Sequence, residues 1–270
     1  MKKTFLATAL IIALTITTTT NAQVGIGVST ANINPSAQLD VTSTTKGFLP
    51  PRMTAAQRDS IASPAQGLML YCINCGVKGE PEYYNGAAWV NFMGGGAAAA
   101  ISLGSSCQGG IVAYIFVSGN PGYVANEIHG LIAATTDQSS GIQWYNGTYN
   151  TIGVTGTAIG IGLSNTNKII SILGATSTNY AAGLARAYTG GGYTDWYLPS
   201  QNELNMIYLN IGPGAAAPLT NIGSFPSVDY WTSTEYYSKY GAWAQSFGDG
   251  SLVAWSKSVT TCYVRAIRTF

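Results

Sequence analysis

The chain has 270 residues, of which 46% are hydrophobic and only 9% are charged, and its net charge is +1. So few charges in near balance exclude the clustered positive field that nucleic-acid binding needs, and a single histidine excludes a histidine-rich metal site. The 17 tyrosines and 6 tryptophans indicate a folded chain rather than a disordered one.

Residues 1–22 have the pattern of a secretory signal peptide, because Lys2 and Lys3 precede an apolar run over 5–16 and small residues before Gln23. The run is shorter than the roughly 20 residues of a membrane span. No longer apolar run follows it. We therefore expect a cleaved leader, no membrane span, and a secreted or cell-surface location; a retained N-terminal anchor is the alternative.

Residues 23–93 predict a small β-rich module. Short strands are expected at 39–41 and 67–71, and Thr54 with Gln57 forms a capping box that opens a helix to about residue 61. Asn85-Gly86 predicts a hairpin turn. A module of this size with few large apolar side chains forms a poor core alone, so we expect several copies of the chain to associate as a stem.

Three glycines and four alanines open residues 94–103, which predict a flexible linker. Residues 104–270 contain the large aromatic side chains of a real core and predict an α+β domain of two to three helices followed by an antiparallel meander. Strands are expected at 111–117 and 131–134, and helices at 165–173 (with Asn165 as its cap), at 179–188 and after the Ser200–Glu203 capping box. Residues 212–229 predict a long loop, and four strands are expected near 230–236, 242–248, 252–257 and 261–268.

Four cysteines remain after the leader, and export makes disulfides their expected state. Cys72 and Cys75 predict a small loop-closing disulfide, with a redox pair or a zinc pair as alternatives. A structural zinc site needs four ligands, and a second cysteine pair is missing. Cys107 and Cys262 lie near the two ends of the second domain and are expected to bridge its first and last strands.

Catalytic signatures are missing from the sequence. It contains no nucleophile elbow, no P-loop and no Gly-x-Gly-x-x-Gly motif that opens a helix. His129 is expected to be structural, and nothing in the spacing brings two carboxylates together for hydrolysis. We therefore expect no catalytic residue, no metal site and no enzymatic activity.

Several motifs of the second domain occur in a specific order, at 109–112, 130–134, 195–204, 230–235 and 264–268. Together they resemble the Lcl C-terminal domain of bacterial collagen-like adhesins across 104–270. The resemblance implies a C-type-lectin-like fold, related to sulfatase-modifying-factor domains, on the bacterial surface. Some members of the family bind sulfated polysaccharides, and trimers occur. The string at 39–54, with 67–71, is similar to the stem modules of exported tail-fibre-like surface proteins, so a homo-oligomer is expected and a trimer is favoured.

Two features depart from related proteins. The calcium motifs of animal C-type lectins are missing, so we expect no cofactor; calcium is the one ion that the resemblance leaves open, and the sequence holds no recognisable site for it. The reactive cysteine pair of sulfatase-modifying enzymes is not reproduced by Cys107 and Cys262. Residues 101–270 contain six basic and seven acidic side chains, so binding of a polyanion would require the few basic ones to cluster.

The motif residues are expected to be structural, with the tryptophans as core anchors and the charged groups as one buried polar network that joins helix to sheet. They are Asp195, Trp196, Glu203, Trp231, Glu235 and Arg265. Ligand contact is expected instead from exposed aromatic side chains, which stack on sugar rings, and from nearby lysines, which pair with carboxylate or sulfate. These are Tyr236, Tyr237, Lys239 and Tyr240 in one turn, and Trp255 and Lys257 on one strand face.

The sequence thus predicts an exported protein whose head binds carbohydrate or another extracellular component. A structural subunit of a fibre or surface layer is the first alternative, in which the turn at 236–240 is an ordinary solvated hairpin. A glycan- or protein-modifying enzyme is the second.

Overall fold

The computed structural model describes residues 23–29, 32–93, 95–125, 127–174, 179–237 and 239–270, so the predicted leader lies outside the described residues. The chain divides into two compact units, Met1–Pro50 and Pro51–Phe270. Within the described ranges, no helix is both long and apolar enough to cross a bilayer.

The first unit contains a two-stranded parallel sheet of β1 (Val24–Ile26) and β2 (Leu39–Val41). β2 confirms the strand predicted at 39–41, and β1 was not predicted. Gly27 follows β1 directly; its φ is +76°, and a Cβ there would overlap the carbonyl oxygen of Thr42. Glycine is therefore required at this position.

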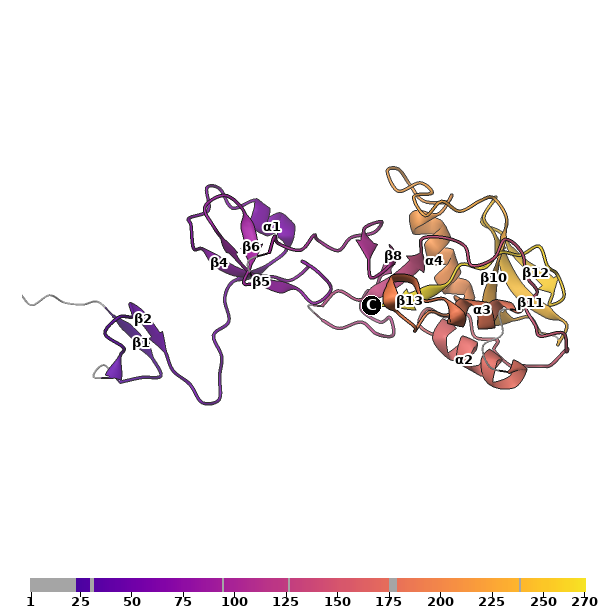
Figure 1. The fold of residues 1–270 in the computed structure, drawn as a ribbon, viewed down its shortest axis with the longest axis horizontal. Helices are drawn as coiled ribbons and strands as arrows, with labels where there is room; N and C mark the ends of the chain where they lie inside the picture. Colours follow the sequence, from indigo (N-terminus) through magenta and orange to yellow (C-terminus); the bar gives the residue numbers. More distant parts are fainter. Residues whose placement is uncertain (1–22, 30–31, 94, 126, 175–178, 238) are drawn as a thin grey trace, which may run out of the picture. The chain divides into compact units, whose positions relative to one another are not determined.

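The second unit begins with a four-stranded sheet in the order β3-β4-β5-β6, of which Figure 1 labels β4, β5 and β6 beside α1. Its elements are β3 (Arg52–Met53), α1 (Ala55–Asp59), β4 (Met69–Cys72), β5 (Glu80–Tyr84) and β6 (Trp89–Asn91). The predicted capping box of α1 is confirmed, because Thr54 and Gln57 exchange hydrogen bonds of 2.9 and 3.2 Å. The predicted hairpin is confirmed by the pairing of Tyr84 with Trp89.

The predicted disulfide between Cys72 and Cys75 is present and buried, with a Cα–Cα distance of 5.5 Å. Beside it, the Nη1 atom of Arg58 donates to both carboxylate oxygens of the fully buried Glu82, at 2.9 and 2.8 Å. This small interior combines one covalent bridge with one ion pair, as expected of a module with few large apolar residues.

The segment that was predicted to be a flexible linker is hydrogen-bonded to this sheet through its described residues. The amide of Ala98 donates to the Glu80 carboxylate at 2.5 Å, and the amide of Gly76 donates to the carbonyl of Ala99 at 3.2 Å. The small side chains of the segment therefore allow its backbone to lie close to the sheet edge.

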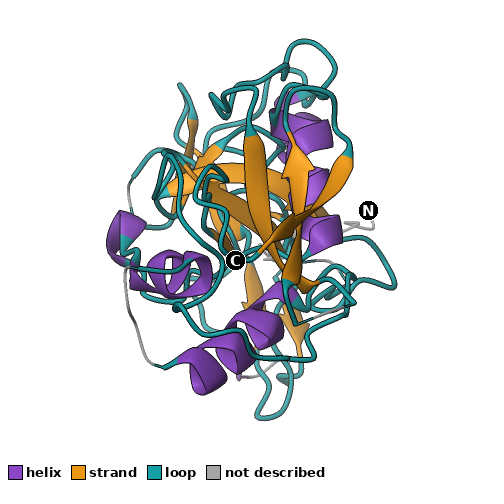
Figure 2. Cartoon of the chain, turned by 90° about the vertical axis from the view of Figure 1, so that its right-hand side faces the viewer, coloured by secondary structure: helices purple, strands orange, loops and turns teal. Residues whose placement is uncertain are grey.

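The rest of the second unit, here called the head, has the predicted α+β architecture, with helices around the outside of two sheets (Figure 2). One sheet has the order β13-β9-β8-β7 and the other β10-β11-β12. The strands are β7 (Ser106–Cys107), β8 (Gly110–Ile115), β9 (Gly130–Ala134), β10 (Asp229–Glu235), β11 (Gly241–Ser246), β12 (Leu252–Ser256) and β13 (Ile267–Thr269). The helices are α2 (Gly162–Leu173), α3 (Ala181–Ala187), the short η2 (Gly190–Gly192) and α4 (Gln201–Ile211).

The last strand differs from the prediction, because the meander contains three strands and not four. β13 leaves it and pairs antiparallel with β9, with Ile267 opposite Ala133. Both side chains are fully buried. Pairing with β9 therefore buries apolar side chains of β13 that would face water at the edge of the meander.

Two helix starts show how capping chemistry is used. α4 begins after Ser200 with the predicted capping box. Asn165, predicted to cap α2, lies inside that helix, which begins at Gly162 after Ile161. Asn165 is buried there and donates to the Gly156 carbonyl at 3.2 Å, which explains why a residue typical of helix caps is found within a helix.

The long loop at 212–229 is tied to the core. The Asn221 side chain binds both the amide and the carbonyl of Phe225, at 2.8 and 2.9 Å. The Phe225 ring is buried against Phe247 and Tyr230. The loop is therefore a packed part of the head.

The predicted bridge between Cys107 and Cys262 is wrong, because both thiols are free and buried. The prediction assumed that the first and last strands are neighbours. The sheet order instead places β7, which holds Cys107, at the edge opposite β13. Cys262 precedes β13 and lies outside the named strands, where its carbonyl accepts a hydrogen bond from the Ile142 amide at 3.1 Å.

Candidate functional site

Exposed tyrosines gather at the turn that joins β10 to β11. Tyr237 is 86% exposed, and Tyr236 and Tyr240 are also exposed. The turn is closed by a hydrogen bond from the Tyr236 amide to the Gly241 carbonyl at 3.1 Å. The Tyr236 ring lies edge-on to those of Tyr237 and Trp243, with centroids 5.4 and 5.2 Å apart. These contacts fix the ring orientations on the surface.

A second segment, which the sequence analysis did not single out, joins this turn. The rings of Tyr145 and Tyr149 lie 4.7 Å apart, and Tyr149 contacts Tyr240 at 5.0 Å. Tyr149 also forms a 3.2 Å hydrogen bond with Ser256 on β12. The signal for it was present in the sequence, since the two tyrosines flank an Asn-Gly turn of the kind that also separates Tyr84 from Trp89. We call Tyr145, Tyr149, Tyr236, Tyr237 and Tyr240 the tyrosine surface.

The phenols of this surface differ in their electrostatics. Hydrogen bonds from Ser256 and Ser258 lower the pKa of Tyr149, whereas desolvation raises the pKa of Tyr145. Lys239 places its ammonium 5.0 Å from the Tyr240 ring centroid, a cation–π distance. The surface thus offers ring faces, hydroxyls and one cation.

Of the two predicted ligand residues at β12, only Trp255 is exposed. Trp255 is opposite Ala242 on β11, and its indole Nε1 donates to the Asp229 carboxylate at 2.7 Å. Lys257 follows β12 and is 1% exposed. The prediction that Lys257 contacts a ligand is therefore wrong, because its charge is already neutralised inside the head.

Lys257 forms a buried ion pair with Glu235. Its Nζ atom lies 2.5 Å from the Glu235 carboxylate, donates to the Asn150 carbonyl at 2.9 Å, and lies 4.7 Å from the Trp144 ring centroid. The carboxylate also accepts hydrogen bonds from the amides of Ile152 and Gly153. This cluster fastens the loop before α2 to the three-stranded sheet, beneath the tyrosine surface.

Among the motif residues, Trp196 and Trp231 are buried anchors, as predicted, and have no exposed area. The charged ones form separate clusters rather than the single network that was predicted. Asp195 pairs with Arg268 at 2.7 Å, and Arg265 pairs with Asp137 at 2.6 Å. Each of these charges is therefore neutralised by its own partner.

Glu203 forms a further cluster without a cation. Its carboxylate accepts hydrogen bonds from the amides of Ser200 and Gly160, both at 2.8 Å, and it is fully buried. Burial raises the pKa of its carboxyl group. Glu203 caps α4 and binds the loop that precedes α2. At Gly162, the first residue of α2, a Cβ would overlap the Glu203 carboxylate, so no side chain fits there.

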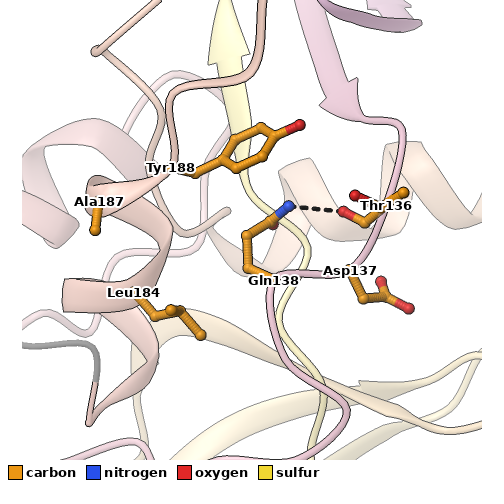
Figure 3. Close-up of a pocket in the computed structure, with 6 residues that line it drawn as sticks. All are labelled: Thr136, Asp137, Gln138, Leu184, Ala187 and Tyr188. Carbon is orange, nitrogen blue, oxygen red and sulfur yellow. Dashed lines mark hydrogen bonds between the residues drawn. The ribbon is translucent and has the colours of Figure 1, made fainter.

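A pocket of 360 Å³ opens between the segment after β9 and α3. Figure 3 shows the Gln138 amide directed at Thr136, a 2.7 Å bond to the Thr136 carbonyl, and Asp137 directed away from Tyr188. Gln138 also accepts a hydrogen bond from Ala266, and Asp137 pairs with Arg265 and Tyr230. The polar side chains of this pocket are thus bound to other parts of the head rather than available to a ligand, so the pocket is a weaker candidate than the tyrosine surface.

Two further sets of potential catalytic or metal-binding side chains, His129 and a cysteine–glutamate group, also have structural partners. His129 is bonded through its two ring nitrogens to the Phe270 carbonyl at 3.0 Å and to Glu127 at 2.9 Å, as expected of a structural histidine. Within the described ranges, the one group of three metal-ligating side chains is Cys72, Cys75 and Glu82. Its sulfurs form the disulfide and its carboxylate pairs with Arg58, so in this state it has no ligand atom to offer a metal.

Comparison with known proteins confirms both predicted resemblances. Residues 133–268, half of the chain, match the family model of the Lcl C-terminal domain. Residues 25–109 match that of a phage tail-like trimerisation region. No curated protein matches the chain. The two matches together indicate a tail-fibre-like surface protein that forms homo-oligomers.

Proposed function

Because the chain belongs to the Lcl C-terminal domain family, we propose that it is an exported, trimeric adhesin-like protein whose head binds carbohydrate through the tyrosine surface. The observation that carries the proposal is that two separate segments bring two groups of contacting rings to this turn: the exposed Tyr236 and Tyr237, and the exposed Tyr240 with the half-buried Tyr149. Rings held in this way present flat apolar faces with hydroxyls at their rims, which suits the alternating CH and OH groups of a sugar. Little conformational entropy is lost on binding, because the rings already hold one another in place.

Charge favours a neutral glycan over a sulfated one. Three of the six basic residues of the head, Lys257, Arg265 and Arg268, are buried in ion pairs. Lys239 is the one basic residue in the tyrosine surface turn at 236–240. Recognition of a polyanion depends on several clustered cations, so a sulfated polysaccharide is the poorer ligand for this head.

We also propose that the head is not an enzyme. Its carboxylates are occupied by structural partners: Asp195 by Arg268, Glu235 by Lys257, and Glu203 by backbone amides. A general acid or base needs a carboxyl group that can reach substrate. This arrangement supports a binding role.

The proposal is tested by binding of the purified full-length chain to a glycan array, with and without calcium and at low and high salt. Removal of one stacked ring, as in Tyr237→Ala or Tyr240→Ala, is expected to weaken binding about 2- to 10-fold per site, which corresponds to about 0.5–1.5 kcal/mol. The loss is larger on a dense array, where several heads bind at once. Tyr123→Ala is the matched control, because Tyr123 is an exposed tyrosine of the head outside the surface.

Saturable binding that resists salt and is lost in the two surface variants, but not in the control, supports a neutral-glycan adhesin. Binding that disappears at high salt would point to a polyanion instead. If the intact oligomer binds no glycan, the proposal fails and the structural subunit of a fibre, which the trimerisation region favours, takes its place.

A further inference from the structure

We propose that one face of the β1–β2 sheet is the surface on which three copies of this chain pack together. This inference rests on the trimeric stem of the proposed function. The face consists of Val24, Ile26, Leu39 and Val41, whose exposures are 54, 55, 51 and 41%. Val24 is opposite Leu39 and Ile26 is opposite Val41. Because alternate residues of a strand share one face, the four aliphatic side chains form a square patch, here called the aliphatic face.

The opposite face of the sheet is already covered by the chain itself. A Cβ at Gly25 would lie 2.9 Å from the side chains of Ile33 and Val28. Asp40, the residue opposite Gly25, accepts a hydrogen bond from the Asn34 amide at 2.9 Å. The segment that follows β1 therefore packs on this side, and the one charged residue of the two strands is directed to it.

A sheet of this kind is incomplete by itself. Two strands of three residues make a ribbon that is marginally stable at best in water. The aliphatic face consists of four contiguous aliphatic side chains and has no polar side chain that could hydrogen-bond to water. The matched trimerisation region starts at residue 25, within β1, and includes all of β2, so the occupant that the chain itself indicates is a further copy of the same face.

The parallel pairing suits a three-fold axis that runs along the strands. Around such an axis, each residue meets its own counterparts at the same height. Val24 and Leu39 from three copies form one layer, and Ile26 and Val41 form the next, about 6.8 Å further along. The three faces close on one another and leave no aliphatic side chain in water.

The test is the mass of the full-length chain in solution, measured by light scattering across a concentration series. The double variant Ile26→Asp/Val41→Asp places six carboxylates in one layer of the trimer. We expect the concentration for half-assembly to rise at least about 100-fold, because apolar burial is lost and like charges are forced together. The matched control is Val117→Asp/Leu252→Asp, which changes two equally exposed aliphatic residues of the head and is expected to remain trimeric.

A second measurement does not depend on disrupting the first unit. Ile26→Cys is expected to cross-link between copies with a short bis-maleimide, whereas Ser36→Cys, in the segment on the covered side, is expected not to. A wild-type trimer in which the double Asp variant stays trimeric, or in which Ile26→Cys gives no cross-link between copies, overturns this interface alone. A wild-type chain that is monomeric at all concentrations overturns the trimeric stem as well.

Discussion

Removal of the Lys257 ammonium is the sharpest test of the head's architecture. In Lys257→Met the Glu235 carboxylate keeps its backbone donors but loses its only cation within 4.0 Å among the described residues, at a position that is 2% exposed. An uncompensated buried charge of this kind costs about 3–5 kcal/mol. The folded population is then expected to fall by roughly two to three and a half orders of magnitude relative to the unfolded one.

The assay is denaturant unfolding of the full-length chain followed by tryptophan fluorescence. Five of the six tryptophans lie in the head, so the signal reports the unfolding of that domain. The control is Lys239→Met, because Lys239 is an exposed lysine of the turn between β10 and β11 and a surface change of this type stays within about 0.5 kcal/mol.

The double variant Lys257→Met/Glu235→Gln separates the charge from the packing. Glutamine can still accept from the Ile152 and Gly153 amides, so the double variant is expected to be more stable than Lys257→Met alone. A destabilisation below about 1 kcal/mol for Lys257→Met would refute the argument that this pair is dry and structural, and would return Lys257 to the list of ligand candidates.

Three further results are expected. Cys107 and Cys262 should not react with Ellman's reagent in the native chain, since both thiols are buried and burial raises their pKa, to about 12 for Cys262. Both should react once the chain is unfolded in denaturant without reductant. If a disulfide joined them, neither would react under those denaturing conditions. Hydrogen bonds from Arg268 lower the pKa of Asp195, so its contribution is present above about pH 4 and is lost as the pH falls through the folded pKa. Because the Asp195 side chain is 52% exposed, Asp195→Asn should remove at most about 1 kcal/mol at pH 6 and less at pH 3 in denaturant titrations. Ser200→Ala should cost about 1–2 kcal/mol in the same assay through loss of the α4 cap, while Ser200→Thr retains most of the stability.

Local chemistry is what the sequence by itself determined about this protein. The capping boxes at Thr54 and Ser200 and the turn at Asn85-Gly86 were located correctly, because each is encoded by neighbours within a few residues. The disulfide between Cys72 and Cys75 was found for the same reason. Family resemblance was recognised from short ordered motifs, whose tryptophans are indeed buried.

Only the tertiary structure decided which distant segments meet. No local pattern indicated the register of β13, which joins β9, or that Cys107 and Cys262 remain free thiols. The sequence pattern placed Lys257 on an exposed strand face, whereas the fold directs it to Glu235. It also left Tyr149 unconnected to Tyr240, although the two rings touch. Pairing across about 90 residues depends on the burial of the whole core, and no local pattern carries that information.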